Sequence, residues 1–130
     1  TAAALEETVA YARERRAFGR PIGGFQAVQH PLAQTATELE QIRLLTMKAA
    51  WLHSQKRECS TEAAMAKLAA TETAVRATDR CMRVLAGHGL VEESPLERLF
   101  RDARLGPFSP ISNEMVLNFI GERLELPRTY

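Results

Sequence analysis

The chain has 130 residues, of which 45% are hydrophobic and 25% are charged, a size and composition that suit one domain with a single buried core. Seventeen basic and sixteen acidic residues leave a formal net charge of +1, which excludes the strongly basic surface of a nucleic-acid-binding or membrane-surface protein. No apolar run approaches the roughly 18 residues that a membrane-spanning helix needs, and no secretory signal pattern is present.

Helical periodicity dominates, and strand patterns are almost absent, because β-branched residues nowhere alternate with polar ones. The first helix is expected over residues 2–16. Its buried stripe is predicted to be Leu5, Val9 and Ala12, which lie on one face. A loop rich in glycine and proline follows over 19–24.

The second and third helices are expected to be the longest, over 25–55 and 61–85, and the Gly87-His88-Gly89 turn ends the third. Residues spaced by steps of three and four share one face of a helix. The faces predicted to point to the core are Val28, Leu32, Thr35, Leu39, Ile42, Thr46 and Ala49 in the second helix, and Ala64, Leu68, Thr71, Val75, Thr78, Met82 and Leu85 in the third.

Two shorter helices complete the expected fold. Ser94-Pro95-Leu96-Glu97 is a capping-box pattern with proline just inside the helix start, so a fourth helix is expected to run from there to about Arg104. Ser112 can cap a fifth helix that stops before Pro127. The predicted fold class is therefore all-α, an up-and-down helical bundle of about four to five helices in a single domain over 1–130.

Residues with metal-binding or redox chemistry are scattered. Cys59 and Cys81 form no CxxC pattern, which favours two reduced thiols in a cytoplasmic protein. The three histidines share no metal-ligand spacing, so no metal site is expected. Because the helical pattern starts at Thr1 rather than after a start methionine, we expect this chain to be a piece of a longer protein.

The segment from Tyr11 to Gln26 is the richest in groups that can bind a ligand. Four arginines surround Phe18 at the end of a helix. An arginine fork can hold a phosphate at two points, and an aromatic ring can lie against a flat base. The spacing alone favours a plainer alternative, a solvated basic helix face with Phe18 packed into the core.

Three motifs, in order and with fitting gaps, resemble the C-terminal helical domain of acyl-CoA dehydrogenases. They cover essentially the whole chain, which would then be about the last third of a family member. The segment 83–90, RVLAGHGL, is similar to Q-I-x-G-G-x-G-[YF], and the segment 95–102, PLERLFRD, is similar to P-x-E-[RK]-x-x-R-D. The third match is to the family's RxxFG…Q motif, whose positions are occupied here by Arg15, Phe18, Gly19 and Gln26.

The resemblance implies an FAD-dependent oxidoreductase that dehydrogenates an acyl-CoA thioester and assembles as a homodimer, a homotetramer or a hetero-oligomer. Arg15 would meet the pyrophosphate and Phe18 the adenine end of a neighbouring subunit's FAD, with Gln26 in the same contact set. Gly87 would let the backbone approach the adenosine diphosphate part. This chain has Arg83 where the family has glutamine, so it would add charge beside a phosphate, unless it is only a surface arginine near a helix end.

The remaining polar residues of these motifs receive structural interpretations. The resemblance places Arg101 and Asp102 on the family's Arg-Asp pair, which we expect to tie down a loop. His88 is expected to have a loop role, and Ala86, which replaces the first glycine of the motif, is expected to be a mild change. Glu72 and Asp79 on the third helix are interpreted as a solvated edge rather than an acid-base pair, because no histidine accompanies them.

The usual position of the family's catalytic base holds a residue that cannot ionise. In most members a glutamate opens an E-G-T triplet eight residues after that aspartate and removes the α-proton of the thioester, while the β-hydrogen leaves as hydride to the flavin. Eight residues after Asp102 this chain has Pro110-Ile111-Ser112. Ser112 can replace the threonine and is counted among the cofactor-binding candidates, but Pro110 cannot replace the glutamate.

Four explanations stay open. The glutamate lies before Thr1, where one branch of the family places it, or Glu114 supplies the base from the first turn of the last helix. A carboxylate there is more commonly just a favourable charge at the positive end of the helix. Otherwise the chain belongs to a catalytically degenerate partner subunit of a heteromeric dehydrogenase, or to a flavin-dependent relative that acts on another substrate.

Overall fold

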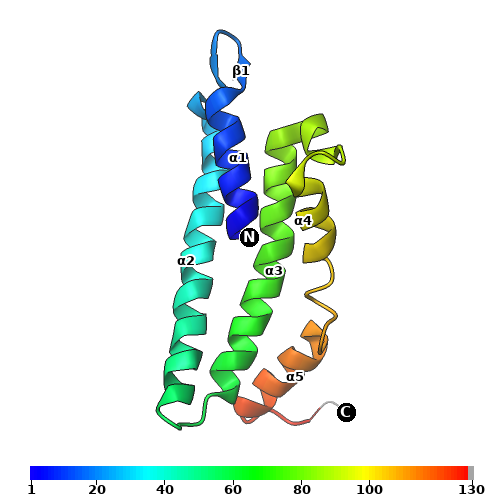
Figure 1. Ribbon diagram of the computed structural model, residues 1–130. Coiled ribbons are helices and arrows are strands. Elements are labelled where there is room, and N and C mark those ends of the chain that lie inside the picture. Colours follow the sequence, from blue (N-terminus) through cyan, green and yellow to red (C-terminus); the bar gives the residue numbers. More distant parts are fainter. Residues whose placement is uncertain (129–130) are drawn as a thin grey trace.

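Five α-helices and one small hairpin make up residues 1–128, the part of the chain that the computed structural model describes (Figure 1). This confirms the all-α class, and the predicted helix boundaries lie within three residues of those observed. The helices are α1 (Ala2–Glu14), α2 (Gln26–Ser54), α3 (Ser60–Leu85), α4 (Pro95–Ala103) and α5 (Asn113–Arg123), with the short 3-10 helices η1 (Ile22–Gly24) and η2 (Ala86–Leu90) and the strands β1 (Arg16–Ala17) and β2 (Arg20–Pro21).

Both predicted serine caps are present. The Leu96 amide donates to Ser94 Oγ at 3.3 Å, and the Met115 amide donates to Ser112 Oγ at 3.4 Å. The capping-box prediction is wrong in its second half, because the Glu97 carboxylate accepts hydrogen bonds from Arg101 one turn later. A guanidinium four residues away on the same face is a stronger partner for a carboxylate than a backbone amide.

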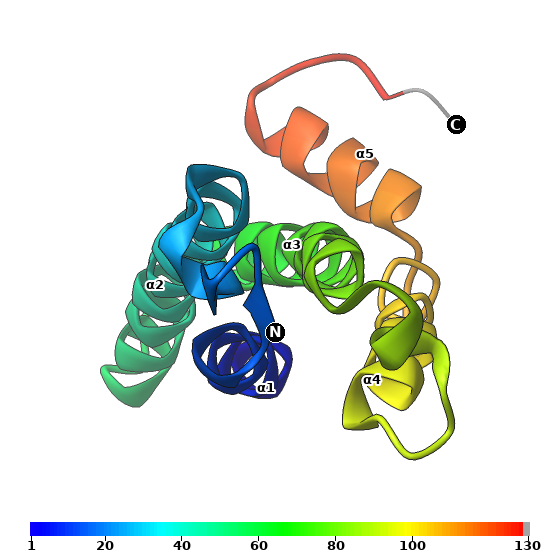
Figure 2. The same cartoon turned by 90° about the horizontal axis from the view of Figure 1, so that it is seen from above.

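The central element of the bundle is α3, which packs against the other four α-helices (Figure 2). It runs antiparallel to α2 over most of its length, with α1 beside the upper half of this pair (Figure 1). On its other side α4 and α5 follow one another along the axis of α3, joined by the loop 104–112. Residues distant in sequence therefore meet on α3 at several levels.

Small side chains mediate the packing of α1, which corrects the predicted stripe. Its buried residues are Ala4, Thr8 and Ala12, spaced by four, whereas Leu5 and Val9 are only half-buried. Small side chains let the helix approach α3 closely, and the Thr8 hydroxyl is satisfied by donating to the Ala4 carbonyl at 2.7 Å. The larger aliphatic side chains turn instead to a shallow groove against α2.

The predicted faces of α2 and α3 are partly correct. In α2 the prediction captures buried Leu32 and Thr35 but misses Leu52, and the remaining predicted positions are half-buried apart from exposed Thr46. In α3 the prediction captures Thr78 and Leu85. Because α3 is surrounded by other helices, it buries more than the one predicted face, including Ala66, Thr73, Ala77 and Cys81.

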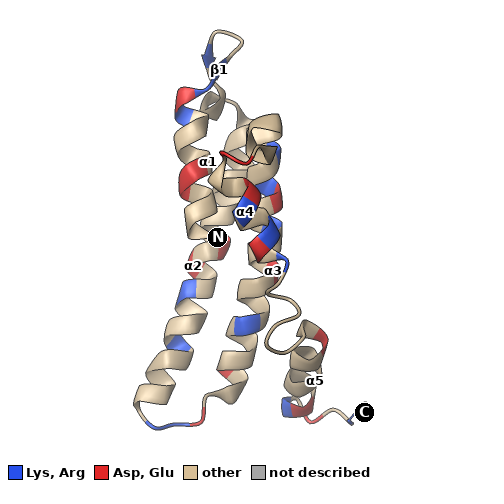
Figure 3. Cartoon of the chain, turned by 45° about the vertical axis from the view of Figure 1, so that its right-hand side comes forward, with Lys and Arg blue, Asp and Glu red and all other residues tan. Residues whose placement is uncertain are grey.

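Charges of both signs are interspersed along α3 and α4 (Figure 3). Several form pairs within one helix, such as Arg83 with Asp79 and Arg101 with Glu97, which are worth little individually in water. Within the described residues, none of the helices combines the length and the apolar character that crossing a membrane requires.

Candidate functional site

The β1–β2 hairpin presents Phe18 to solvent at one end of the bundle. Arg16 pairs with Pro21 and Ala17 with Arg20, which leaves Phe18 and Gly19 as a two-residue turn. Their φ angles are +51° and +80°, the positive pair that defines a type I′ turn. Phenylalanine is rare with positive φ, and this side chain is 96% exposed. The alternative in which Phe18 fills the core is therefore wrong.

The base of this hairpin is fixed to α1. The Arg15 amide donates to the Tyr11 carbonyl at 2.8 Å, and the Ile22 amide donates to the Arg15 carbonyl at 2.7 Å. A side chain at Gly23 would lie 2.9 Å from the Ala12 carbonyl oxygen, so the chain crosses α1 where only glycine fits. The backbone of Arg15 is thus held rigidly while its side chain is exposed.

A second aromatic ring supports the exposed one. Phe25 meets Phe18 edge to face, with ring centroids 6.1 Å apart. The Arg20 guanidinium lies 4.0 Å from the centroid of the Phe25 ring. Gln26, the next residue, opens α2 and is exposed beside them. Phe18, Phe25 and Arg20 therefore form one cluster, and the exposed side chains of Arg15 and Gln26 are positioned by the segments on either side of it.

The end of α3 lies at the same end of the molecule. Arg83 is 79% exposed, and its Nε is 3.0 Å from Asp79 Oδ2. A Cβ added at Gly87 would meet no atom within 4 Å, so the space beside this backbone is open. His88 stacks on Tyr11 of α1 with centroids 4.9 Å apart, which joins the two segments.

Ala86 is a larger departure from the family pattern than expected. Its φ of +51° and ψ of −133° lie in a region that side chains disfavour and that glycine adopts easily. The backbone thus retains the shape that a glycine would take at this position. The sequence showed the substitution but not the dihedral angles that make it costly.

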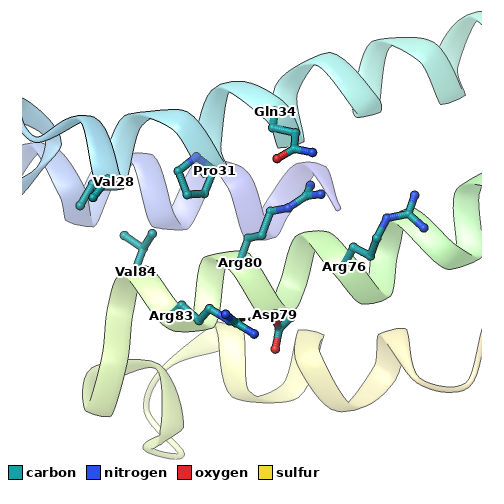
Figure 4. Close-up of a pocket in the computed structure, with 9 residues that line it drawn as sticks. Val28, Pro31, Gln34, Arg76, Asp79, Arg80, Arg83 and Val84 are labelled. Atoms are coloured by element: carbon teal, nitrogen blue, oxygen red, sulfur yellow. Dashed lines mark hydrogen bonds and ion pairs between the residues drawn. The ribbon is translucent and has the colours of Figure 1, made fainter.

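A hollow of about 490 Å³ opens between α2 and α3 next to this surface (Figure 4). The α2 wall is largely apolar, with Val28 and Pro31, and the α3 wall is charged. Arg80 is not available to a ligand there, because it donates to both carboxylate oxygens of Glu38 at 2.7 and 3.0 Å. Arg83 is therefore the more exposed cation at the rim.

The Glu38–Arg80 pair was missed in the sequence because its partners are 42 residues apart. Its side chains are only 17% and 18% exposed. Hydrogen bonds from Arg80 lower the pKa of Glu38, and the same bonds raise the pKa of Arg80. The pair locks α2 to α3 beneath the hollow.

The other candidate residues lie in a separate region, the loop 104–112 and the start of α5. Pro110 is exposed, and half-buried Ser112 caps α5. Glu114 is exposed and lines a hollow of about 340 Å³ with Glu72, Arg76 and Pro107. Each of Glu72 and Asp79 has an arginine partner four residues later, in keeping with a solvated helix edge.

The two regions are far apart along α3. Lys67 of α3 contacts the loop through Ile111 and Asn113, whereas Arg83 marks the other region. Sixteen residues of helix (83 − 67) correspond to about 24 Å. The structure thus brings one set of candidates together and leaves a second set elsewhere. The first set is Arg15, Phe18, Gln26, Arg83 and Gly87, and the second is Pro110, Ser112 and Glu114.

The first set provides the groups that can bind a nucleoside diphosphate. Exposed guanidinium groups of Arg15 and Arg83 can bind phosphate oxygens, the Phe18 ring offers a stacking face, and the backbone at Gly87 is open to close approach. Arg101, expected to tie down a loop with Asp102, is bonded instead to Glu97 within α4. It does not join either set.

Comparison with known proteins agrees with the resemblance that the three sequence motifs indicate. Residues 1–125 match the family model for "Acyl-CoA dehydrogenase, C-terminal domain". The chain is 50% identical over 103 residues to the short-chain specific acyl-CoA dehydrogenase, mitochondrial, of Bos taurus, a match that covers 79% of this chain and 25% of the relative.

Solved structures agree with that match. Butyryl-CoA dehydrogenase from Megasphaera elsdenii superposes with a TM-score of 0.94 at 33% identity, over 96% of this chain and 33% of that one. The FAD complex of PigA superposes with a TM-score of 0.93 at 30% identity, again over 96% and 33%. The chain therefore spans between a quarter and a third of the length of these relatives.

Proposed function

Because the chain belongs to the acyl-CoA dehydrogenase family and has the fold of its C-terminal helical domain, we propose that it is the C-terminal part of a longer FAD-dependent enzyme. The proposed reaction is the α,β-dehydrogenation of an acyl-CoA thioester. The chain would supply FAD contacts and an oligomer interface. Bound FAD would supply the flavin ring that accepts the hydride.

One observation carries this proposal, the exposed Phe18 held in a type I′ turn, three residues after exposed Arg15 and at the end of the bundle to which α3 brings Arg83. An aromatic side chain in a disfavoured backbone conformation, with no burial to gain, is a typical functional feature. Phe18 points away from its own bundle, so it suits contact with the adenine end of an FAD bound mainly elsewhere. Arg15 and Arg83 would bind the pyrophosphate, with Gln26 and Gly87 beside them.

The orientation of Phe18 also supports an assembly of subunits. We propose a homodimer or homotetramer in which the hairpin of one subunit reaches the FAD of its neighbour, with a hetero-oligomer as the variant form. The loop that contains Pro110 and Ser112 contacts α3 at Lys67, about 24 Å along the helix from Arg83. It would therefore face a different part of the bound molecules. We propose the cytoplasm as the location, although the bovine relative is named as mitochondrial.

The catalytic base is proposed to come from a segment outside these residues. Pro110 has no ionisable group, and Glu114 lies at a hollow shared with Arg76 of α3. The same observation favours the second candidate, a degenerate partner subunit that binds FAD without catalysing the reaction. A flavin-dependent enzyme with another substrate is the remaining alternative.

Flavin content and reduction test the proposal in the intact protein that carries this domain. We expect one FAD per subunit and loss of the flavin absorbance when an acyl-CoA substrate is added anaerobically. Arg15→Ala should weaken FAD binding at least tenfold. The matched control is Arg98→Ala, which removes an exposed arginine of α4 and should leave FAD binding unchanged. Protein without flavin would refute the cofactor assignment, and flavin that no acyl-CoA reduces would favour the degenerate subunit.

A further inference from the structure

Lys67, on α3, joins the bundle to the loop 104–112. Its Nζ donates to the Ile111 carbonyl and to Asn113 Oδ1, each at 2.6 Å. Thr71, one turn later on the same face, has its Oγ1 3.1 Å from that same amide oxygen. Asn113 is buried, and because the single Thr71 hydroxyl hydrogen is shared with the Lys67 carbonyl at 3.0 Å, the amide oxygen depends mainly on Lys67. Lys67 therefore holds the residues on both sides of Ser112.

Apolar burial does little to fix the position of the loop. Its large apolar side chains are exposed, at 64% for Leu105, 72% for Phe108 and 47% for Ile111. Burial of these side chains therefore supplies little of the free energy that would order the loop. The loop is held by polar contacts and by a close approach of Gly106, where an added Cβ would lie 3.0 Å from Thr71 Cγ2.

The charge of Lys67 is held without a counter-ion. No carboxylate of the described residues lies within ion-pair distance of its ammonium group, and its two bonded acceptors are neutral. A half-buried cation in such a setting is costly unless its hydrogen bonds are good ones. By contrast, Lys48 pairs with Glu62 at 3.1 Å. Lys67 thus serves the loop oxygens rather than an ion pair.

We propose that Lys67 is the positioning residue of the loop 104–112. It keeps the Pro110-Ile111-Ser112 triplet at a fixed distance from α3 and so sets where the loop meets the acyl-CoA and the flavin. The positioning itself follows from the contacts of this chain. Its consequence for the reaction rests on the proposed function, and the two are tested separately.

Amide hydrogen exchange in the intact protein tests the positioning. In Lys67→Met, the amide of Asn113, which donates to the Pro107 carbonyl at 2.8 Å, should exchange at least tenfold faster. Amides of α1 and α2 should be unchanged, Lys67→Arg should retain most of the protection, and Lys48→Met should leave the loop unaffected. Unchanged loop exchange in Lys67→Met, or equal acceleration everywhere, would overturn the proposal. Lys67→Gln, which is uncharged and too short to reach both acceptors, replaces Lys67→Met with the same expected result if that variant does not fold.

Kinetics and flavin binding test the consequence. In an active protein, Lys67→Met should lower kcat at least tenfold while FAD affinity falls much less than in Arg15→Ala, because the proposed pyrophosphate contacts are far along α3 and only the Ser112 contact lies at the loop. Lys67→Arg should recover most of the kcat. A loss of FAD affinity as large as that of Arg15→Ala, or an unchanged kcat with a mobile loop, would refute a positioning role in the reaction. If no acyl-CoA is a substrate, the proposed function fails while the exchange experiment still decides the positioning.

Discussion

Replacing Phe18 with asparagine should stabilise the isolated fold and weaken cofactor binding at the same time. Phe18 is the first residue of the type I′ turn, with φ of +51°. A side chain other than glycine or asparagine costs roughly 1–2 kcal/mol in the left-handed region. Asparagine adopts that region readily, and Asn-Gly is the preferred pair for this turn. The substitution therefore removes most of the strain.

The loss that opposes this gain is small. The ring is 96% exposed, so almost no apolar burial is lost. The edge-to-face contact with Phe25, at 6.1 Å, is worth about 0.5 kcal/mol at an exposed site. The free energy of unfolding should therefore rise by about 0.5–1 kcal/mol. Phe18→Ala is the matched control, because it removes the ring but keeps a strained side chain, and it should give no gain.

Urea denaturation of the 130-residue chain, followed by helical circular dichroism, measures the stability difference between the two variants. In the intact protein both variants should weaken FAD binding alike, since each lacks the ring that is proposed to contact the adenine end. If Phe18→Asn is no more stable than Phe18→Ala, then the turn is not strained and the functional interpretation of its geometry is wrong. If FAD affinity is unchanged in both, the ring has no part in cofactor binding.

Three further changes follow from the same structure. Ala86→Gly should raise the free energy of unfolding by about 1 kcal/mol in the same assay, since relief of a positive φ outweighs the added freedom of the unfolded chain; a loss of stability would contradict this. Glu38→Gln should destabilise by about 1–3 kcal/mol, against less than about 0.5 kcal/mol for exposed Glu72→Gln. Because folding lowers the pKa of Glu38 from its ordinary 4.5, its contribution is complete above that pH and is lost as the pH falls through the folded-state value, so the difference between Glu38→Gln and wild type should shrink in acid titrations. Pro110→Ala removes no ionisable group, so the shape of the pH profile of kcat should be unchanged even if the loop shifts, and an altered profile would show that this position is coupled to the catalytic base.

Local patterns in the sequence were sufficient to predict the helices. Ser94 and Ser112 cap their helices as expected, and glycine and proline mark the breaks. The buried face of α1 was not predictable in the same way. Leu5 and Val9 form the more hydrophobic stripe, but α3 approaches the side of Ala4 and Thr8, where small side chains permit closer packing. Which of two apolar faces is chosen depends on the neighbouring helix.

The candidate site also has some features that local sequence predicts and others that depend on long-range packing. The motif residues Arg15, Phe18 and Gln26 lie close together because they are close in sequence, and α3 brings Arg83 to the same end. The turn geometry of Phe18 and the contacts of Lys67 with Ile111, 44 residues away, have no local pattern that could reveal them. Long-range polar contacts of this kind follow from the packing of whole helices.

The contacts of Lys67 also bear on the choice between an enzyme and a degenerate subunit. In a subunit that only binds FAD, the loop 104–112 would meet the flavin alone, and its exposed apolar side chains would have no acyl-CoA to cover them. The loop is nevertheless fixed at Ile111 and Asn113, while its apolar side chains remain exposed. Such an arrangement suits a loop that is covered by a ligand during the reaction. It favours an enzyme whose base comes from another segment.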